Sequence, residues 1–120
     1  MVPARLELSC GLRRVPVFGP IVALALGGTM IEMISEAVLL RPPFDEQEAH
    51  RAVSGMLRGR LVSGTRGLTK PELAVTARLM AALGQLGLEL PDVAEVDVNP
   101  VRVADDAVRA ADALVVLEAP

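Results

Sequence analysis

The uncharged stretch over residues 15–31 most constrains how this chain can fold. It follows Arg13-Arg14, so a twin-arginine export signal or a membrane span has to be weighed. The stretch is shorter than the roughly 20 residues that a spanning helix needs, and prolines and glycines interrupt it throughout. We therefore predict a strand over residues 21–26, covered on both faces and bounded by turn residues, and no membrane association.

The composition indicates a single domain and argues against a nucleic-acid-binding or disulfide-bonded protein. The chain has 120 residues, which fits one domain, and it is 52% apolar with only Phe18 and Phe44 as aromatic residues. Its formal net charge is −3 and its arginines are scattered, so we predict no nucleic-acid partner. Cys10 is the single cysteine, which excludes an intramolecular disulfide and favours a reducing compartment, the cytoplasm.

The first third of the chain is expected to be mainly strand. Residues 5–10 alternate, with Leu6 and Leu8 on one face and charged or polar side chains on the other, which indicates a half-buried strand. Gly27-Gly28 ends the apolar strand over residues 21–26. Residues 29–40 fit either a helix or a strand, and their β-branched side chains favour extended structure.

Two helices should follow, each opened by a capping residue. Asp45 as N-cap predicts a helix over residues 46–58. Thr69, with Glu72 three positions on, predicts a second helix that ends just before Gly87, which we interpret as its terminator.

Two more strands close the chain, over residues 93–98 and 108–117, with a turn containing Asp105-Asp106 between them. Strands, two consecutive helices and further strands together predict an α+β fold. We expect a mixed, mostly antiparallel sheet with both helices packed on one face. Because no repeat or linker interrupts the pattern, residues 1–120 are expected to form one domain.

The segment Glu95-Val96-Asp97-Val98-Asn99-Pro100 is the most informative for chemistry. Side chains alternate along a strand, so Glu95, Asp97 and Asn99 share one face while the valines between them can be buried. Adjacent carboxylates repel each other unless a cation is present, and hard oxygen ligands suit magnesium. The spacing alone is equally met by an edge strand with a solvated polar face.

Three further motifs accompany this segment along the chain. They are Phe18-Gly19-Pro20 followed by Gly27-Gly28 and Glu32, the loop Ser63-Gly64-Thr65-Arg66-Gly67, and Asp112-Ala113 in the last expected strand. In this order the four motifs resemble the C-terminal half of the ATP-grasp domain of ADP-forming acyl-CoA synthetases, relatives of succinyl-CoA synthetase. The resemblance covers nearly the whole chain.

The resemblance implies a site for Mg²⁺ and for ATP or ADP. It implies that Asn99 and Asp112 hold the magnesium on the ATP phosphates, with Asp97 beside them. Candidates for contact with the nucleotide are Gly27, Gly28, Glu32, Arg66 and Glu95. For these candidates ordinary structural roles stay open: a tight turn for the two glycines, a solvated strand carboxylate for Glu32, and a surface position or a contact with a partner domain for Arg66.

The resemblance also implies a reaction, in which acyl-CoA, ADP and phosphate are interconverted with a carboxylate, CoA and ATP. The family's adenine-binding hinge and phosphate-contacting lysine lie upstream of every motif present here. We therefore expect the N-terminal ATP-grasp half and the CoA-binding and ligase domains to be partners, and the isolated chain to be inactive. Where the family commonly has Asp, this chain has Val15 and Glu36.

A non-catalytic role is the alternative. The same fold could be a remnant that pairs with another chain, a second copy included, through surface that the missing half would cover. A large exposed apolar patch would favour this alternative. The acyl group is left open by the sequence, as is the presence of an acetyltransferase domain in the parent protein.

Overall fold

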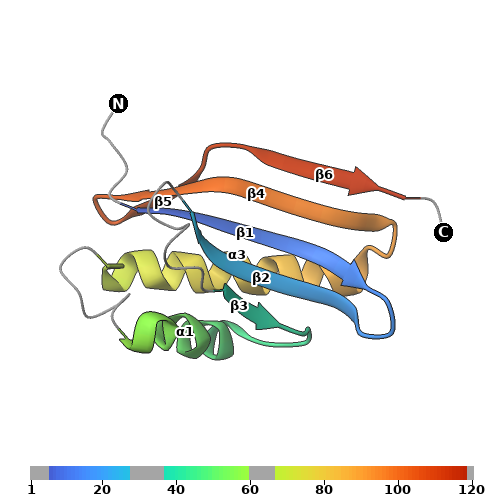
Figure 1. Cartoon of the computed structure of the whole chain (residues 1–120), viewed down its shortest axis with the longest axis horizontal. Coiled ribbons are helices and arrows are strands. Elements are labelled where there is room, and N and C mark those ends of the chain that lie inside the picture. Colours follow the sequence, from blue (N-terminus) through green and yellow to red (C-terminus); the bar gives the residue numbers. More distant parts are fainter. Residues whose placement is uncertain (1–5, 28–36, 60–66, 119–120) are drawn as a thin grey trace.

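The computed structural model describes residues 6–27, 37–59 and 67–118 (Figure 1). Within these residues the chain forms a six-stranded antiparallel sheet and two α-helices, as predicted. The strands are β1 (Leu6–Val15), β2 (Gly19–Gly27), β3 (Ala37–Leu40), β4 (Val93–Ala104), β5 (Ala107–Ala110) and β6 (Ala113–Leu117). The helices are α1 (Glu46–Ser54), the 3₁₀ turn η2 (Met56–Gly59) and α3 (Lys70–Glu89).

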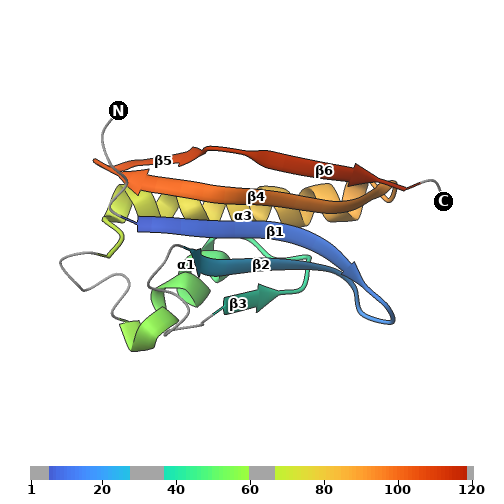
Figure 2. The same ribbon diagram turned by 45° about the horizontal axis from the view of Figure 1, so that its top comes forward.

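The strand order is β3-β2-β1-β4, and β5 and β6 both pair with the outer edge of β4. β5 lies beside the second half of β4 and β6 beside its first half (Figure 2). Both helices lie on one face of the sheet, where α3 contacts β1, β2, β4 and β5 while α1 packs against α3 (Figure 1). The opposite face is left without a covering layer by the described residues.

The core lies between the sheet and α3, and it is built from aliphatic side chains and Cys10. Alternate residues of β1 and β2 enter it, as a strand with one covered face requires, and β4 follows the same pattern except where its register shifts. The buried members include Leu8, Cys10 and Leu12 of β1, Val22 and Leu24 of β2, Val96 and Val98 of β4, and Leu73, Ala77 and Met80 of α3. Burial raises the pKa of the Cys10 thiol to about 12, so this residue is a small apolar core side chain.

The strand predicted over residues 21–26 is present as part of β2, but the expectation that both of its faces are covered is wrong. Val22, Leu24 and Leu26 are buried, but Ile21 and Ala23 on the other face are only half-buried. The helices cover a single face of the antiparallel sheet, so an apolar run can also border an open surface. Of residues 29–40, only 37–40 are described, and these form a strand as predicted.

Both predicted helix starts are confirmed by their capping bonds. Glu48 N donates to Asp45 Oδ1 at 2.8 Å. At the start of α3, Thr69 N donates to Glu72 Oε1 at 2.9 Å and Glu72 N donates to Thr69 Oγ1 at 3.3 Å, which completes a capping box. The Glu72 side chain is fully buried and its Oε2 accepts from Asp106 N at 3.0 Å, so α3 is tied to the turn after β4.

The predicted helix ends are wrong. α1 stops at Ser54 with Gly55 as its C-cap, and η2 takes up the residues that were expected to continue it. α3 runs on to Glu89, so Gly87 lies inside the helix. A Cβ at Gly87 would lie 2.8 Å from Leu12 Cδ1, which shows that this glycine allows α3 to approach the sheet closely.

Arg14 of β1 closes the C-terminal end of α3. Its Nη2 donates to the carbonyl oxygens of Gly87 at 3.0 Å and Leu90 at 2.8 Å, and its Nε donates to Val93 O at 2.8 Å. The last turn of α3 contains no basic residue of its own. A cation from a neighbouring strand therefore satisfies carbonyl groups that a helix end leaves without partners.

The two central strands, β1 and β4, are longer than predicted. β1 continues past Cys10 to Val15 because it pairs with β2 and β4 at once. β4 continues past Val98 to Ala104, and the turn at Asp105-Asp106 is confirmed, with φ of 51° and 62° at these residues. The expected strand over residues 108–117 is divided into β5 and β6.

Within the described ranges, no helix combines the length and the apolar character that crossing a membrane would require.

Candidate functional site

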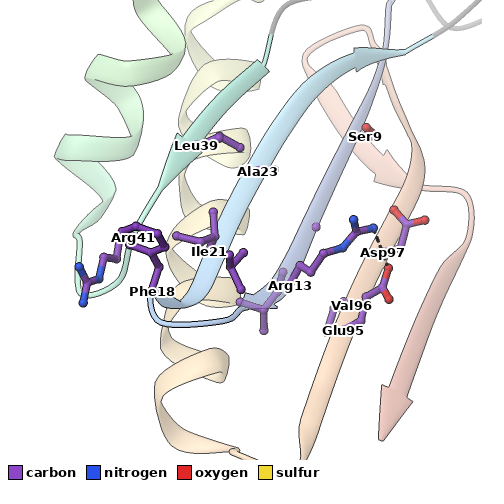
Figure 3. A pocket seen from close by; sticks show the side chains of 13 residues that line it. Ser9, Arg13, Phe18, Ile21, Ala23, Leu39, Arg41, Glu95, Val96 and Asp97 are labelled. Atoms are coloured by element: carbon purple, nitrogen blue, oxygen red, sulfur yellow. Dashed lines mark hydrogen bonds and ion pairs between the residues drawn. The ribbon is translucent and has the colours of Figure 1, made fainter.

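The sheet face opposite the helices carries an open hollow of about 580 Å³ (Figure 3). Figure 3 shows Arg13, Glu95 and Asp97 on the side of β1 and β4, and Phe18, Leu39 and Arg41 on the side of β2 and β3. Its polar lining includes Ser9, Arg13, Arg41, Glu95 and Asp97, and its apolar lining includes Val15, Phe18, Ile21 and Leu39. The hollow therefore offers both charged groups and apolar contacts on one surface.

β4 delivers two carboxylates to this hollow. Val96 and Val98 are buried in the core, so Glu95 and Asp97 between and beside them point to the open face, as the alternation predicted. Figure 3 shows both carboxylates next to the Arg13 side chain. The polar face of this strand is therefore confirmed for Glu95 and Asp97.

Asn99 lies at an irregularity of β4. Leu8 pairs with Val101 and Cys10 pairs with Val98, so β4 has one more residue than β1 between these pairs. Val98 and Val101 are consequently both buried, with Asn99 and Pro100 between them. The Asn99 side chain is exposed, and the Asn99-Pro100 peptide bond is cis.

The backbones of Asn99 and Asp112 meet directly. Asn99 N donates to Asp112 O at 3.1 Å, and Ala111 N donates to Pro100 O at 2.9 Å, so the link between β5 and β6 lies beside the irregularity of β4. Asp112 Oδ1 accepts from Ala113 N at 2.9 Å. The predicted antiparallel approach of these two segments is confirmed, while the ligand roles of Asn99 and Asp112 stay predictions.

Arg13 is a residue that the sequence reasoning missed. Its Nη2 lies 3.2 Å from Glu95 Oε1, in a cross-strand ion pair between β1 and β4 (Figure 3). Extending the alternation of β1 past Cys10 would have placed Ser9, Gly11 and Arg13 on the face of the carboxylates. The strand was predicted only as far as Cys10, and Arg13-Arg14 was weighed only as part of an export signal.

A family model described as an ATP-grasp domain matches residues 1–117. The chain belongs to this ATP-grasp family. Its relatives include the β subunit of ADP-forming acetate–CoA ligase I from Pyrococcus furiosus, 30% identical over 98% of this chain and 50% of the relative. ADP-forming acetate–CoA ligase I from Archaeoglobus fulgidus is 32% identical over 98% of this chain and 17% of the relative.

Solved structures agree with this assignment. The dinucleotide-forming acetyl-coenzyme A synthetase 1 of Ca. Korarchaeum cryptofilum, in complex with coenzyme A and Mg-AMPPCP, superposes with a TM-score of 0.82 at 30% identity. The match covers 98% of this chain and 55% of that chain. The ATP-grasp chain thus spans about half or less of the proteins it matches.

Three predicted site residues of the ATP-grasp chain, Gly28, Glu32 and Arg66, lie outside the described residues, and so does Glu36. Gly27 is the last residue of β2 and pairs with Glu7. Val15, where the family commonly has Asp, borders the hollow with 37% of its surface exposed. His50, the single histidine of the sequence, is exposed on α1.

The oxygen groups near the irregularity of β4 are a suitable donor set for magnesium. Asp97 and Asp112 supply carboxylates and Asn99 an amide oxygen, which are the hard ligands that this ion prefers. Within residues 6–27, 37–59 and 67–118 there is no cluster of three His, Cys, Asp or Glu side chains that could hold a metal alone. Magnesium usually completes its shell with water and phosphate oxygens.

Proposed function

We propose that this chain is a single domain, the C-terminal half of an ATP-grasp module, and that it binds magnesium and the ATP phosphates in an ADP-forming acyl-CoA synthetase. The observation that carries the proposal is the open sheet face of β4, with Glu95 and Asp97 beside the meeting point of Asn99 and Asp112. Membership of the ATP-grasp family supports it, as do relatives that are ADP-forming acetate–CoA ligases.

In the proposed reaction, acyl-CoA, ADP and phosphate give a carboxylate, CoA and ATP. Bound magnesium would neutralise phosphate charge during phosphoryl transfer. Asp97, Asn99 and Asp112 would hold the ion, and Glu95 and Gly27 remain proposed nucleotide contacts. The register separates these two, because Gly27 pairs with Glu7 and Glu95 pairs with Arg13 at the opposite end of β1. Gly28, Glu32 and Arg66 remain proposed contacts, and the cytoplasm remains the proposed compartment.

The proposed partners are the N-terminal ATP-grasp half and the CoA-binding and ligase domains. The chain covers half or less of the relatives' length, which supports the need for these other parts. We expect the isolated chain to bind ATP weakly and to show no turnover. Robust ATP formation from acetyl-CoA, ADP and phosphate by the isolated chain would contradict this proposal.

The site itself can be tested in a chimaera in which this chain replaces the matched half of the P. furiosus β subunit. Asp112→Asn and Asn99→Ala should each sharply reduce magnesium-dependent ATP formation. Asp105→Asn is the matched control, because Asp105 belongs to the turn after β4 and should matter little. Equal losses in all three variants, or full activity in Asp112→Asn, would reject the assignment.

The second candidate is a non-catalytic module that pairs with another chain, and β6 supports it. All five residues of β6 are exposed, and Leu114, Val115, Val116 and Leu117 have 39–71% of their surfaces accessible. A strand this apolar at a sheet edge is a template for pairing. Sedimentation of the chain over a range of concentrations tests it: self-association that Val115→Lys abolishes would support pairing, whereas a monomer throughout would exclude the homo-oligomer.

A further inference from the structure

We propose that Arg13 is a positioning residue that engages Glu95 and so leaves Asp97 as the carboxylate that receives the cation. This inference rests on the proposed function, since it concerns the magnesium site on β4. It assigns different roles to two carboxylates that the sequence pattern treats alike.

The register of the sheet sets the ion pair. Arg13 of β1 is the direct cross-strand partner of Glu95 on β4, and Arg13 Nη2 lies 3.2 Å from Glu95 Oε1 (Figure 3). The side chains are 74% and 34% exposed, respectively, so the pair is open to solvent on the side of the hollow. An exposed pair of this kind stabilises a fold little, which makes its effect on charge more important than its effect on stability.

Asp97 has a different environment. Its cross-strand partner on β1 is Gly11, and its partner on β6 is Leu114, so neither neighbouring strand places a cation opposite it. A Cβ at Gly11 would lie 2.9 Å from Val96 O and 3.9 Å from Asp97 Oδ1. The close approach of β1 and β4 therefore keeps the position opposite Asp97 free of any side chain.

The consequence is a difference in local charge. Arg13, Glu95 and Asp97 together carry one net negative charge, and the ion pair of Arg13 is with Glu95, so Asp97 is the carboxylate left to bind a cation. Without Arg13, two carboxylates on one strand face, about 7 Å apart by strand geometry, would both attract a divalent ion. With Arg13 present, the ion alone binds weakly and depends on the phosphate oxygens that accompany it.

The size of the effect follows from Coulomb's law. A single positive charge about 6 Å from a divalent cation in water weakens binding by about tenfold, and physiological salt reduces this to about threefold. Arg13→Gln should therefore raise the affinity for the free cation about threefold.

The same two strands provide a matched control. Arg102 of β4 pairs across the ladder with Glu7 of β1, with Arg102 Nε 3.8 Å from Glu7 Oε1. Each of the four residues is next to a buried residue of its strand, but Arg102 and Glu7 lie at the other end of the ladder, away from Asp97. Arg102→Gln changes the net charge of the chain by the same amount.

The experiment is a titration of the ¹⁵N-labelled chain with Mn²⁺, in which paramagnetic broadening of the Asp97 and Gly11 amide signals reports binding. We expect about threefold tighter binding in Arg13→Gln, wild-type affinity in Arg13→Lys, and wild-type affinity in the double variant Arg13→Gln/Glu95→Gln, where the local charge is restored. Arg102→Gln should bind like the wild type. Asp97→Asn should lose most of the broadening.

Four outcomes would overturn the inference. Equal affinities in wild type and Arg13→Gln, with Asp97→Asn still defective, would refute the role of Arg13 and leave the proposed function standing. A gain in Arg102→Gln equal to that in Arg13→Gln, or a gain that persists in the double variant, would show that Arg13 does not act through Glu95. Failure of every variant to bind Mn²⁺, with or without ATP, would refute the proposed function and this inference together.

Discussion

Arg14 should contribute more to the stability of the fold than Arg13, the other arginine of β1. Its guanidinium donates three hydrogen bonds, to the carbonyl oxygens of Gly87, Leu90 and Val93, and thereby joins β1 to the end of α3 and the start of β4. The substitution Arg14→Met keeps the aliphatic stem and removes all three donors. Two of the bonds are partly buried and the one to Leu90 is exposed.

The magnitude can be built from these contacts. Each partly buried bond from a charged donor contributes about 1 kcal/mol, and the exposed bond about 0.5 kcal/mol once solvent competes. A cation at a helix end adds about 0.3–1 kcal/mol. The free energy of unfolding should therefore fall by about 3 kcal/mol, a large part of the 5–15 kcal/mol that is usual for a domain.

Urea unfolding followed by circular dichroism measures this loss. Arg13→Met is the control, because Arg13 makes a single exposed ion pair and its removal should cost less than about 0.5 kcal/mol. Arg14→Lys should recover part of the loss, since it restores the charge but not the three-way geometry. A loss below about 0.5 kcal/mol in Arg14→Met, with an unchanged denaturant slope, would refute the reasoning.

Three further predictions follow from buried positions. Gly87→Ala should destabilise the fold by about 1–3 kcal/mol in thermal unfolding, because the new Cβ would lie 2.8 Å from Leu12 Cδ1, whereas Gly55→Ala, with no atom closer than 3.6 Å, should be nearly neutral. Glu72→Gln should cost about 2 kcal/mol and speed hydrogen exchange at Asp106 N, since an amide NH₂ cannot accept from that donor. For Cys10, the unfolded thiol ionises near its ordinary pKa of 9.0 and the folded one only near 12, so the unfolded state binds fewer protons between these values. Stability should therefore fall as the pH rises from about 9 to 12 by about 1.4 kcal/mol per pH unit more than in Cys10→Ala, and equal slopes in the two proteins would contradict the raised pKa.

The candidate site was predictable to the extent that it depends on local alternation. Glu95 and Asp97 reach the open face because β4 is a strand with a buried side, and both conditions are visible in the order of valines and carboxylates. The meeting of Asn99 with Asp112 followed from pairing two strands joined by a tight turn. The pairing of Arg13 with Glu95 was not predictable in this way, because the two residues are 82 positions apart and only the register brings them together.

The sequence by itself determined the local features of this protein: the capping bonds of Asp45 and Thr69, the turn at Asp105-Asp106, and the α+β order of elements. Each of these depends on groups within a few residues of one another, so short-range preferences decide them. The tertiary structure decided the lengths of β1 and β4, the open face of β2, and the place of Gly87 inside α3. These features depend on which strands pair and how closely a helix approaches the sheet, and both are settled by packing between segments far apart in the chain.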